Sequence, residues 1–234
     1  MAPKTLVLFD IDGTLLLTAG AGRRALTTAM LNEVTSVADF DRVRFDGKTD
    51  PQIVRELLEV ANHPRAEDRG FIDGICERYV GFLEAELQHP RTVMTVMPGI
   101  HELLEGLESH AHTVLGLLTG NMAQGAALKL SAAGIAPSRF AVGAYGSDSA
   151  HRPDLPAIAA RRAQTHFGRV PHGPEVVIIG DTPADVTCGL GISARAIGVA
   201  TGAYSVESLT AAGAHATFAD LSDTPRVLEA ILGE

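Results

Sequence analysis

The chain has 234 residues, of which 46% are hydrophobic, and a formal net charge of -9. This length allows a large buried core, and we expect one core domain that carries a smaller appendage. The acidic balance argues against nucleic acid or an anionic membrane surface as a partner, so a small, diffusing molecule is expected. The sequence leaves the choice between monomer and homodimer open.

Cysteine usage and apolar runs indicate the compartment. The two cysteines, Cys76 and Cys188, lie far apart in segments of helical character, which predicts neither a disulfide nor a thiolate zinc site. The apolar start of the chain is interrupted by Asp10 and Asp12, and no apolar run approaches the roughly 20 residues that span a bilayer. We therefore expect a cytoplasmic protein without a membrane segment.

Short apolar runs alternate with longer amphipathic stretches over most of the chain. This pattern is typical of an α/β protein with a buried parallel sheet. The predicted strands are Thr5–Phe9, Thr113–Leu118, Phe140–Val142, Val176–Ile179, Ala194–Val199 and Ala216–Phe218. The predicted helices between and after them are Ile100–Ser109, Met122–Ala133, Leu155–Phe167, Ala184–Leu190, Val206–Ala212 and Pro225–Leu232.

One region breaks this alternation. Between Leu17 and about Met97 the sequence shows three helical patterns and no convincing strand, which predicts an inserted helical domain. The predicted helices are Gly22–Val34, Pro51–Ala61 and Glu67–Leu87, the second with Asp50 as its N-cap and Pro51 in its first position. We expect a core domain of residues 1–16 and 98–234 and a helical domain of residues 17–97.

Two acidic residues follow the first predicted strand. Asp10 and Asp12 lie just beyond its carboxyl end, at the edge where doubly wound sheets bind ligands. Two residues apart, they point the same way if the strand conformation persists, and Gly13 permits a sharp turn after them. Thr14 adds a hydroxyl nearby. An Asp-Gly turn alone is equally typical of a plain strand end, so the interpretation depends on two later segments.

Those two segments also place polar residues at strand ends. Thr119, Gly120 and Asn121 precede a helix whose first amides suit a phosphate. The fourth strand ends before two further acids, Asp181 and Asp185. Four acids at one edge would repel one another unless a cation lay among them, and oxygen ligands favour Mg²⁺ over zinc or copper.

Together these motifs resemble the haloacid dehalogenase-like (HAD) hydrolase superfamily, and within it the phosphoglycolate phosphatase and β-phosphoglucomutase-like group. The segment from Asp10 to Thr14 is similar to the first motif of the family, Thr119 to the second, and Gly180-Asp181-Thr182-Pro183-Ala184-Asp185 to the fourth. The resemblance covers nearly the whole chain. It implies a doubly wound, Rossmann-like α/β core with an inserted α-helical cap.

The resemblance also implies a chemistry. Asp10 would be the nucleophile that forms an aspartyl-phosphate, and Asp12 would protonate the leaving alcohol and then activate water. A carboxylate at position 12 favours phosphate esters over carbon–halogen bonds as substrates. The implied Mg²⁺ ligands are Asp10, the backbone carbonyl of Asp12, Asp181 and Asp185. The implied phosphate-binding residues are Thr119, Gly13, Thr14, Gly120 and Asn121.

The sequence departs from the family pattern at the third motif. Where a lysine normally precedes a proline, this chain has Arg152 before Pro153. Of its three lysines, Lys4 and Lys129 are not expected at the sheet edge. Arg152 is therefore the candidate for the cation that neutralises the nucleophile, because a guanidinium can clamp carboxylate or phosphate oxygens. The alternative is that Arg152 is a solvated residue at a helix start.

Three residues of the helical domain are candidates for substrate contacts. Gly47 and Lys48 lie just before its second helix, in the part of the cap that faces the active site in similar proteins. Arg23 lies in the first helix and follows the nucleophile loop. A solvated loop lysine and an exposed arginine are the competing interpretations.

The prediction is a Mg²⁺-dependent phosphatase that hydrolyses a small phosphate monoester, similar to phosphoglycolate or a sugar phosphate. Two alternatives stay open. A phosphomutase would pass the phosphoryl group to another hydroxyl instead of water. A non-catalytic binding protein would keep the fold and the metal site without turnover.

Overall fold

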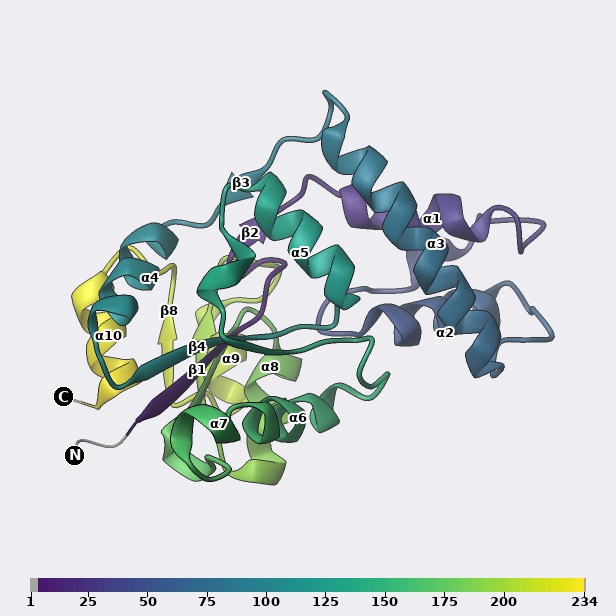
Figure 1. Cartoon of the computed structure of the whole chain (residues 1–234). Coiled ribbons are helices and arrows are strands. Elements are labelled where there is room, and N and C mark those ends of the chain that lie inside the picture. The colour runs from purple at the N-terminus through teal and green to yellow at the C-terminus, as the bar shows by residue number, and fades with distance from the viewer. Residues whose placement is uncertain (1–3, 234) are drawn as a thin grey trace.

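The structure is a computed structural model that describes residues 4–233, and at its centre lies a parallel sheet of six strands (Figure 1). The strands lie in the order β5-β4-β1-β6-β7-β8. Their bounds are β1 (Thr5–Phe9), β4 (Thr113–Leu118), β5 (Val142–Ala144), β6 (Val176–Gly180), β7 (Arg195–Val199) and β8 (Ala216–Phe218). The predicted α/β class with a parallel sheet is confirmed.

Helices cover both faces of this sheet. Their bounds are α4 (Ile100–Ser109), α5 (Ala123–Ala132), α6 (Leu155–Arg162), α7 (Gln164–Phe167), α8 (Pro183–Cys188), α9 (Val206–Ala211) and α10 (Thr224–Leu232). Val7 and Phe9 of β1 pack in the layer of α4, α5 and α10, whereas Leu6 and Leu8 pack in the layer of α6 and α8. Side chains alternate between the faces of a strand, and both faces here are buried. The strands therefore read as continuous apolar runs in the sequence.

The order of the strands changes direction at β1. The chain passes from β1 through β4 to β5 on one side and then returns to β6 on the other side. Phe9, the last residue of β1, pairs with Leu117 of β4 and with Ile179 of β6. The loops after these three strands therefore meet at one edge, and ligands of doubly wound sheets bind at such a switch point.

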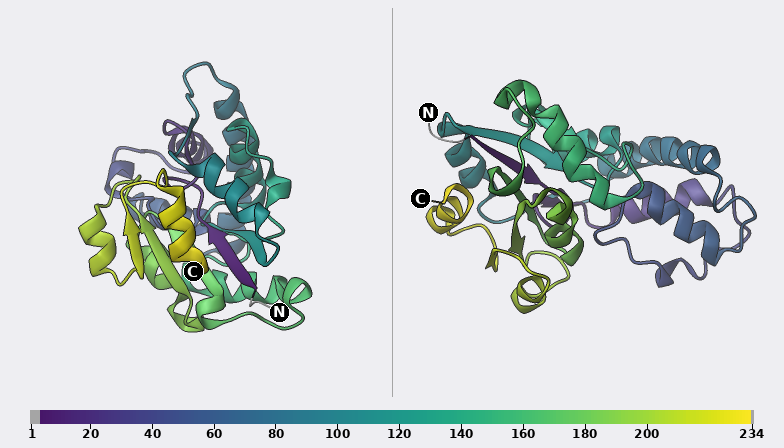
Figure 2. Two further views of the ribbon diagram at one scale, coloured as in Figure 1. Left: turned by 90° about the vertical axis from the view of Figure 1, so that its left-hand side faces the viewer. Right: turned by 90° about the horizontal axis from the view of Figure 1, so that it is seen from below.

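The helical insertion lies beyond this edge, at the opposite end of the molecule from the two termini (Figure 2). Its helices are α1 (Ala21–Met30), α2 (Asp50–Val60) and α3 (Arg69–Gln88), and they share an apolar cluster of their own. The helical insertion on an α/β core is thus confirmed, while the exact domain boundaries stay a prediction. No helix within residues 4–233 combines the length and the apolar character needed to cross a membrane.

The segment that was expected to lack strands contains one. β3 (Thr95–Val96) pairs antiparallel with β2 (Leu16–Leu17), so a two-stranded ribbon joins the insertion to the core. The expectation was wrong because strands of two residues are too short to show the alternation that identifies a strand.

The start of α2 also differs from the sequence prediction. Thr49, not Asp50, is its N-cap, and Thr49 Oγ1 accepts a hydrogen bond from the Gln52 amide at 3.3 Å. Asp50 is the first helical residue and is buried against the core. There its Oδ2 accepts a hydrogen bond from the Met122 amide at 2.8 Å. Asp50 therefore ties the insertion to the core instead of capping its own helix.

Short 3₁₀ helices complete the described chain, and other element bounds shift by a few residues. The 3₁₀ helices are η1 (Phe40–Arg42), η2 (Pro137–Arg139), η3 (Arg152–Asp154), η4 (Gly173–Glu175) and η5 (Gly189–Ile192). The third predicted strand, Phe140–Val142, begins only at Val142, because Phe140 closes η2 and packs edge-on against Phe9. The helix predicted over Leu155–Phe167 is interrupted at Ala163.

Candidate active site

A cavity of about 350 Å³ lies between the carboxyl edge of the sheet and the helical insertion. The core contributes the loops after β1, β4 and β6 to its wall, together with Lys129 of α5 and Arg152 of η3. The core residues in this wall are Asp10, Asp12, Thr119, Gly120, Asn121, Lys129, Arg152, Asp181 and Thr182. Residues from the insertion include Gly22, Arg23, Phe45, Gly47, Lys48, Asp50 and Tyr79. Most of the residues singled out in the sequence therefore meet at one cavity.

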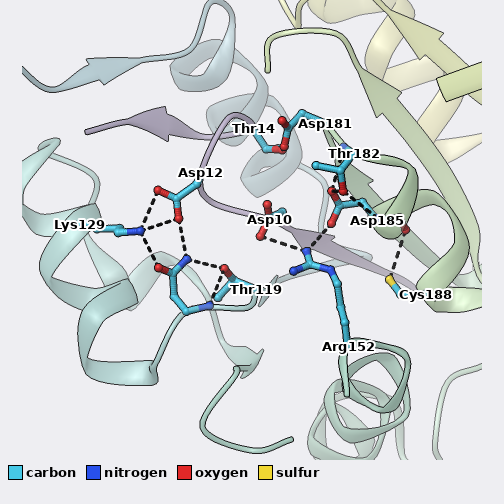
Figure 3. Close-up of polar contacts among 11 residues, drawn as sticks. Asp10, Asp12, Thr14, Thr119, Lys129, Arg152, Asp181, Thr182, Asp185 and Cys188 are labelled. Carbon is cyan, nitrogen blue, oxygen red and sulfur yellow. Dashed lines mark hydrogen bonds and ion pairs between the residues drawn. The ribbon is translucent and has the colours of Figure 1, made fainter. Parts of the chain in front are cut away.

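Arg152 is buried between two carboxylates in the core wall of this cavity (Figure 3). Its Nη2 lies 3.3 Å from Asp10 Oδ1 and also donates a hydrogen bond to Asp185 Oδ1. Burial of the guanidinium opposes its charge, but Asp185 and Asp10 outweigh this effect and raise the pKa of Arg152. The arginine is thus a fixed positive charge beside Asp10, and the interpretation of a solvated residue is wrong.

Asp185 is held at the start of α8 by a capping box with Thr182. Its Oδ2 accepts hydrogen bonds from the Thr182 amide at 3.0 Å and from the Thr182 hydroxyl at 2.6 Å. In return, the Asp185 amide donates to Thr182 Oγ1 at 3.2 Å. A threonine followed three residues later by an acid favours this reciprocal arrangement. Both oxygens of Asp185 are therefore oriented by protein donors, Oδ1 by Arg152 and Oδ2 by Thr182.

Asp181 lies in a space that two glycines leave open. A Cβ atom on Gly13 would lie 2.4 Å from Asp181 Oδ2, and one on Gly202 would lie 1.8 Å from it. Gly13 also has a φ of 85°, which favours glycine. Thr14 Oγ1 donates a hydrogen bond to Asp181 Oδ1 at 3.2 Å. Gly13 and Thr14, which the sequence assigned to phosphate binding, thus lie against Asp181.

Three of these carboxylates are close enough to share a metal ion. Asp10, Asp181 and Asp185 each offer an oxygen, and these oxygens lie within 4.8 Å of one another. Burial raises the pKa of Asp10 to about 7, against the effect of Arg152 and with added repulsion from Asp185. Burial, with repulsion from Asp185 and Asp10, raises the pKa of Asp181 to about 8.

The charge of this group fits a divalent cation. If all three carboxylates are ionised, the guanidinium of Arg152 balances only one of their charges, and two negative charges are left without a partner. Oxygen donors alone, without nitrogen or sulfur, are the ligands of hard cations such as Mg²⁺. The donor set therefore fits the metal that the sequence predicted.

Asp12 turns toward a different set of partners, although it is only two residues from Asp10 (Figure 3). Lys129 Nζ donates hydrogen bonds to both carboxylate oxygens of Asp12, at 2.8 Å and 2.6 Å. Asn121 Nδ2 donates to Asp12 Oδ2 at 2.8 Å and to Thr119 Oγ1 at 2.7 Å. Asp10 and Asp12 were expected to point the same way only if the strand conformation persisted, and this condition is not met because the strand ends at Phe9.

Lys129 is the residue that the sequence prediction missed. It was not expected at the sheet edge, and it lies two turns into a helix, yet its side chain is only 5% exposed and faces the cavity. Helical side chains lean toward the helix N-terminus, and a lysine stem is long enough to span this distance. A signal was present in the sequence, since Lys129 is the only charged residue among Ala123–Ala132.

The insertion rests closely on the loop after β4. A Cβ atom on Gly120 would lie 1.9 Å from the Lys48 carbonyl oxygen, and the Gly120 carbonyl accepts a hydrogen bond from the Asp50 amide at 2.7 Å. Thr49 Oγ1 donates to the Ala150 carbonyl at 2.8 Å. Gly47, with a φ of 72°, packs against Thr182. Gly47 and Gly120 thus allow the backbones of insertion and core to approach each other.

The two basic candidates of the insertion both line the cavity but already have protein partners. Lys48 forms an ion pair with Glu56. Arg23 donates to the Val43 carbonyl at 3.0 Å, and its guanidinium lies 3.8 Å from the centre of the Phe45 ring. Their substrate contacts stay predictions.

Comparisons with known proteins agree with this architecture. Residues 7–189 match the family model described as haloacid dehalogenase-like hydrolase. No curated protein sequence gives a significant match. A hydrolase from Pseudomonas syringae shares the fold with a TM-score of 0.74 and 22% identity, covering 97% of this chain and 99% of that one.

Two further solved structures are similar over nearly their whole length. A predicted phosphoglycolate phosphatase from Haemophilus somnus has a TM-score of 0.72 and 16% identity, covering 96% of this chain and 97% of the other. A protein provisionally assigned as a β-phosphoglucomutase, from Bacteroides vulgatus, has a TM-score of 0.68 and 18% identity, covering 99% and 90%. At these identities the likeness concerns the fold.

Proposed function

Because the chain belongs to the haloacid dehalogenase-like hydrolases, we propose that it is a Mg²⁺-dependent phosphatase acting on a small phosphate monoester. The observation that carries the proposal is the separation of two carboxylates in one cavity. Asp10 faces Arg152 and two further acids, whereas Asp12 faces Lys129 and Asn121. Two carboxylates in different surroundings suit two different roles in one reaction.

Asp10 is the proposed nucleophile. One of its oxygens attacks phosphorus, a bond forms to give an aspartyl-phosphate, and the bond from phosphorus to the ester oxygen breaks. Arg152, beside Asp10, stabilises negative charge on the phosphoryl oxygens as this exchange proceeds. Thr119 accepts a hydrogen bond from Asn121, so its own hydroxyl proton is available to a phosphoryl oxygen.

Asp12 is the proposed acid and base. In the first step it gives its proton to the departing alkoxide oxygen. In the second step it takes a proton from the water that attacks the aspartyl-phosphate, and this releases inorganic phosphate and restores Asp10. The half-exposed carboxylate of Asp12 lines the cavity, where it can reach both the leaving group and the incoming water.

Asp10, Asp181, Asp185 and the backbone carbonyl of Asp12 are the proposed ligands of Mg²⁺. When bound, the ion would neutralise charge on the phosphoryl oxygens and on the acids that hold it. The cavity volume of about 350 Å³ suits a small ester, such as phosphoglycolate or a sugar phosphate. Gly47, Lys48 and Arg23 form the wall from which the insertion would select the alcohol portion.

Phosphate release from a panel of phosphorylated metabolites, with Mg²⁺ and with a chelator, tests this proposal. The panel includes phosphoglycolate, sugar phosphates and nucleotides. We expect Mg²⁺-dependent release that is lost in Asp10→Asn, because an amide cannot act as the nucleophile. Release that persists in Asp10→Asn would contradict the mechanism, and conversion of a sugar phosphate into an isomer without free phosphate would identify a mutase.

A further inference from the structure

Lys129 uses all three protons of its ammonium group in hydrogen bonds on the side of the cavity where Asp12 lies, which we call the acid–base side. Its ammonium donates to Asp12 Oδ1 at 2.8 Å, to Asp12 Oδ2 at 2.6 Å and to Asn121 Oδ1 at 2.6 Å. A lysine ammonium has three protons, so each one has an acceptor here. The Lys129 side chain is 5% exposed, whereas that of Asp12 is 42% exposed. The buried Lys129 ammonium thus binds the Asp12 carboxylate, which is exposed to the cavity.

Asn121 completes the hold on Asp12. Because Lys129 can only donate, the Asn121 oxygen must face Lys129 and its amide nitrogen must face Asp12 and Thr119. Asn121 Nδ2 donates to Asp12 Oδ2 at 2.8 Å and to Thr119 Oγ1 at 2.7 Å. Asp12 therefore receives three hydrogen bonds from two side chains, which fixes both the position and the plane of its carboxylate.

The insertion covers this arrangement from the other side. A Cβ atom on Gly22 of α1 would lie 3.6 Å from Lys129 Nζ and 3.6 Å from the Tyr79 hydroxyl. Asp50, at the start of α2, is a further carboxylate that acts electrostatically on Lys129. The ammonium is thus enclosed between core and insertion, where it is kept out of bulk water.

We propose that Lys129 is a positioning residue for Asp12, which it holds in the orientation that transfers protons to the leaving group and from water. This inference rests on the phosphatase function proposed above. The lysine keeps its own three protons throughout, and the proton that moves belongs to Asp12. The two cations of the core wall therefore have two different tasks: Arg152 serves Asp10 and the phosphoryl group, and Lys129 serves Asp12.

Substrates with different leaving groups separate these tasks. An alkyl phosphate needs a proton on its departing oxygen, whereas 2,4-dinitrophenyl phosphate releases a stable anion without one. In Lys129→Met we expect kcat/KM for the alkyl ester to fall about 10²-fold, which is the lower range of acid–base catalysis. For the dinitrophenyl ester kcat/KM should change little, and a burst of dinitrophenol should precede slow turnover because water activation in the second step also needs Asp12.

Arg152→Met is the matched control. It also removes a buried cation of this cavity, but one that lies beside Asp10, the proposed nucleophile, and not beside Asp12. It should lower kcat/KM for both esters alike. Equal losses for both esters in Lys129→Met, or no loss for either, would overturn the positioning role.

A second readout needs no turnover and separates failure of this inference from failure of the phosphatase proposal. If the wild-type protein hydrolyses neither ester, the phosphatase proposal fails. Crystal structures of the wild type and Lys129→Met then decide the positioning role alone. A displaced or multiply oriented Asp12 carboxylate in the variant supports it, and an unchanged Asp12 refutes it.

Discussion

The two sides of the cavity are built differently, although the carboxylates at their centres are two residues apart. The Asp10 side, with Arg152, Asp181 and Asp185, comes entirely from the core. The Asp12 side also consists of core residues, but its cation, Lys129, lies beneath Gly22 and Tyr79 of the insertion. Core residues therefore assemble both carboxylates with their cations, but only the cation of the Asp12 side, Lys129, is covered by the insertion.

The largest expected effect is a difference in unfolding free energy between variants of the two sides, because Asp10 is buried whereas Asp12 is half-exposed. Arg152→Met leaves Asp10 and Asp185 buried without their cation, and losing one partner of a buried ion pair costs about 3–5 kcal/mol of unfolding free energy. Lys129→Met leaves Asp12, which water can reach, and one unpaired oxygen on Asn121, so we expect a loss of about 1–2 kcal/mol. Urea unfolding of both variants in the presence of a chelator measures the difference. Equal losses would mean that the two sides do not differ in this way.

The next prediction concerns the junction of insertion and core. Burial raises the pKa of Asp50 from 3.8 to about 6, with Lys129 opposing the shift. Because the pKa of Asp50 is higher in the folded than in the unfolded protein, protonation of Asp50 favours folding. This contribution to the unfolding free energy is fully present below pH 3.8 and is lost as the pH rises through about 6.

Asp50→Asn keeps an acceptor for the Met122 amide and removes the charge. We therefore expect the variant to be more stable than the wild type at pH 8, by up to about 3 kcal/mol, with the difference shrinking toward pH 4. Urea unfolding across this pH range measures it. A variant that is less stable than the wild type at pH 8 would show that electrostatic attraction between the Asp50 carboxylate and the Lys129 ammonium stabilises the junction.

The sequence alone was sufficient for the Asp10 side, because its residues follow strands that are buried on both faces. Such strands appear as apolar runs, and their carboxyl ends show directly which residues share the edge, as they did for Asp10 and Asp181. Arg152 was found at the position of the third motif, through the proline that follows it.

The Asp12 side could not be predicted in the same way. Lys129 reaches the cavity from the second turn of a helix, and its contact with Asp12 spans 117 positions in the chain. Asp50 was interpreted as a helix cap because Pro51 after it suits the first position of a helix, and only the packed structure shows that Asp50 faces Met122. Both contacts join residues that are far apart in the chain, and local sequence patterns do not encode such contacts.

The smallest expected effect concerns the close contact between the insertion and the loop after β4. A Cβ atom on Gly120 would meet the Lys48 carbonyl, so Gly120→Ala must displace the insertion and should cost about 1–2 kcal/mol of unfolding free energy. Gly81→Ala is the matched control, because Gly81 lies in α3 with open space around it and should gain about 0.5–1 kcal/mol.

Calorimetric titration of Gly120→Ala with Mg²⁺ then distinguishes the two sides of the cavity. If the Asp10 side belongs to the core alone, Mg²⁺ affinity should equal that of the wild type while hydrolysis of alkyl phosphates falls. A parallel loss of Mg²⁺ affinity would show that the seat of the insertion also shapes the metal ligands, and the division between the two sides would not hold.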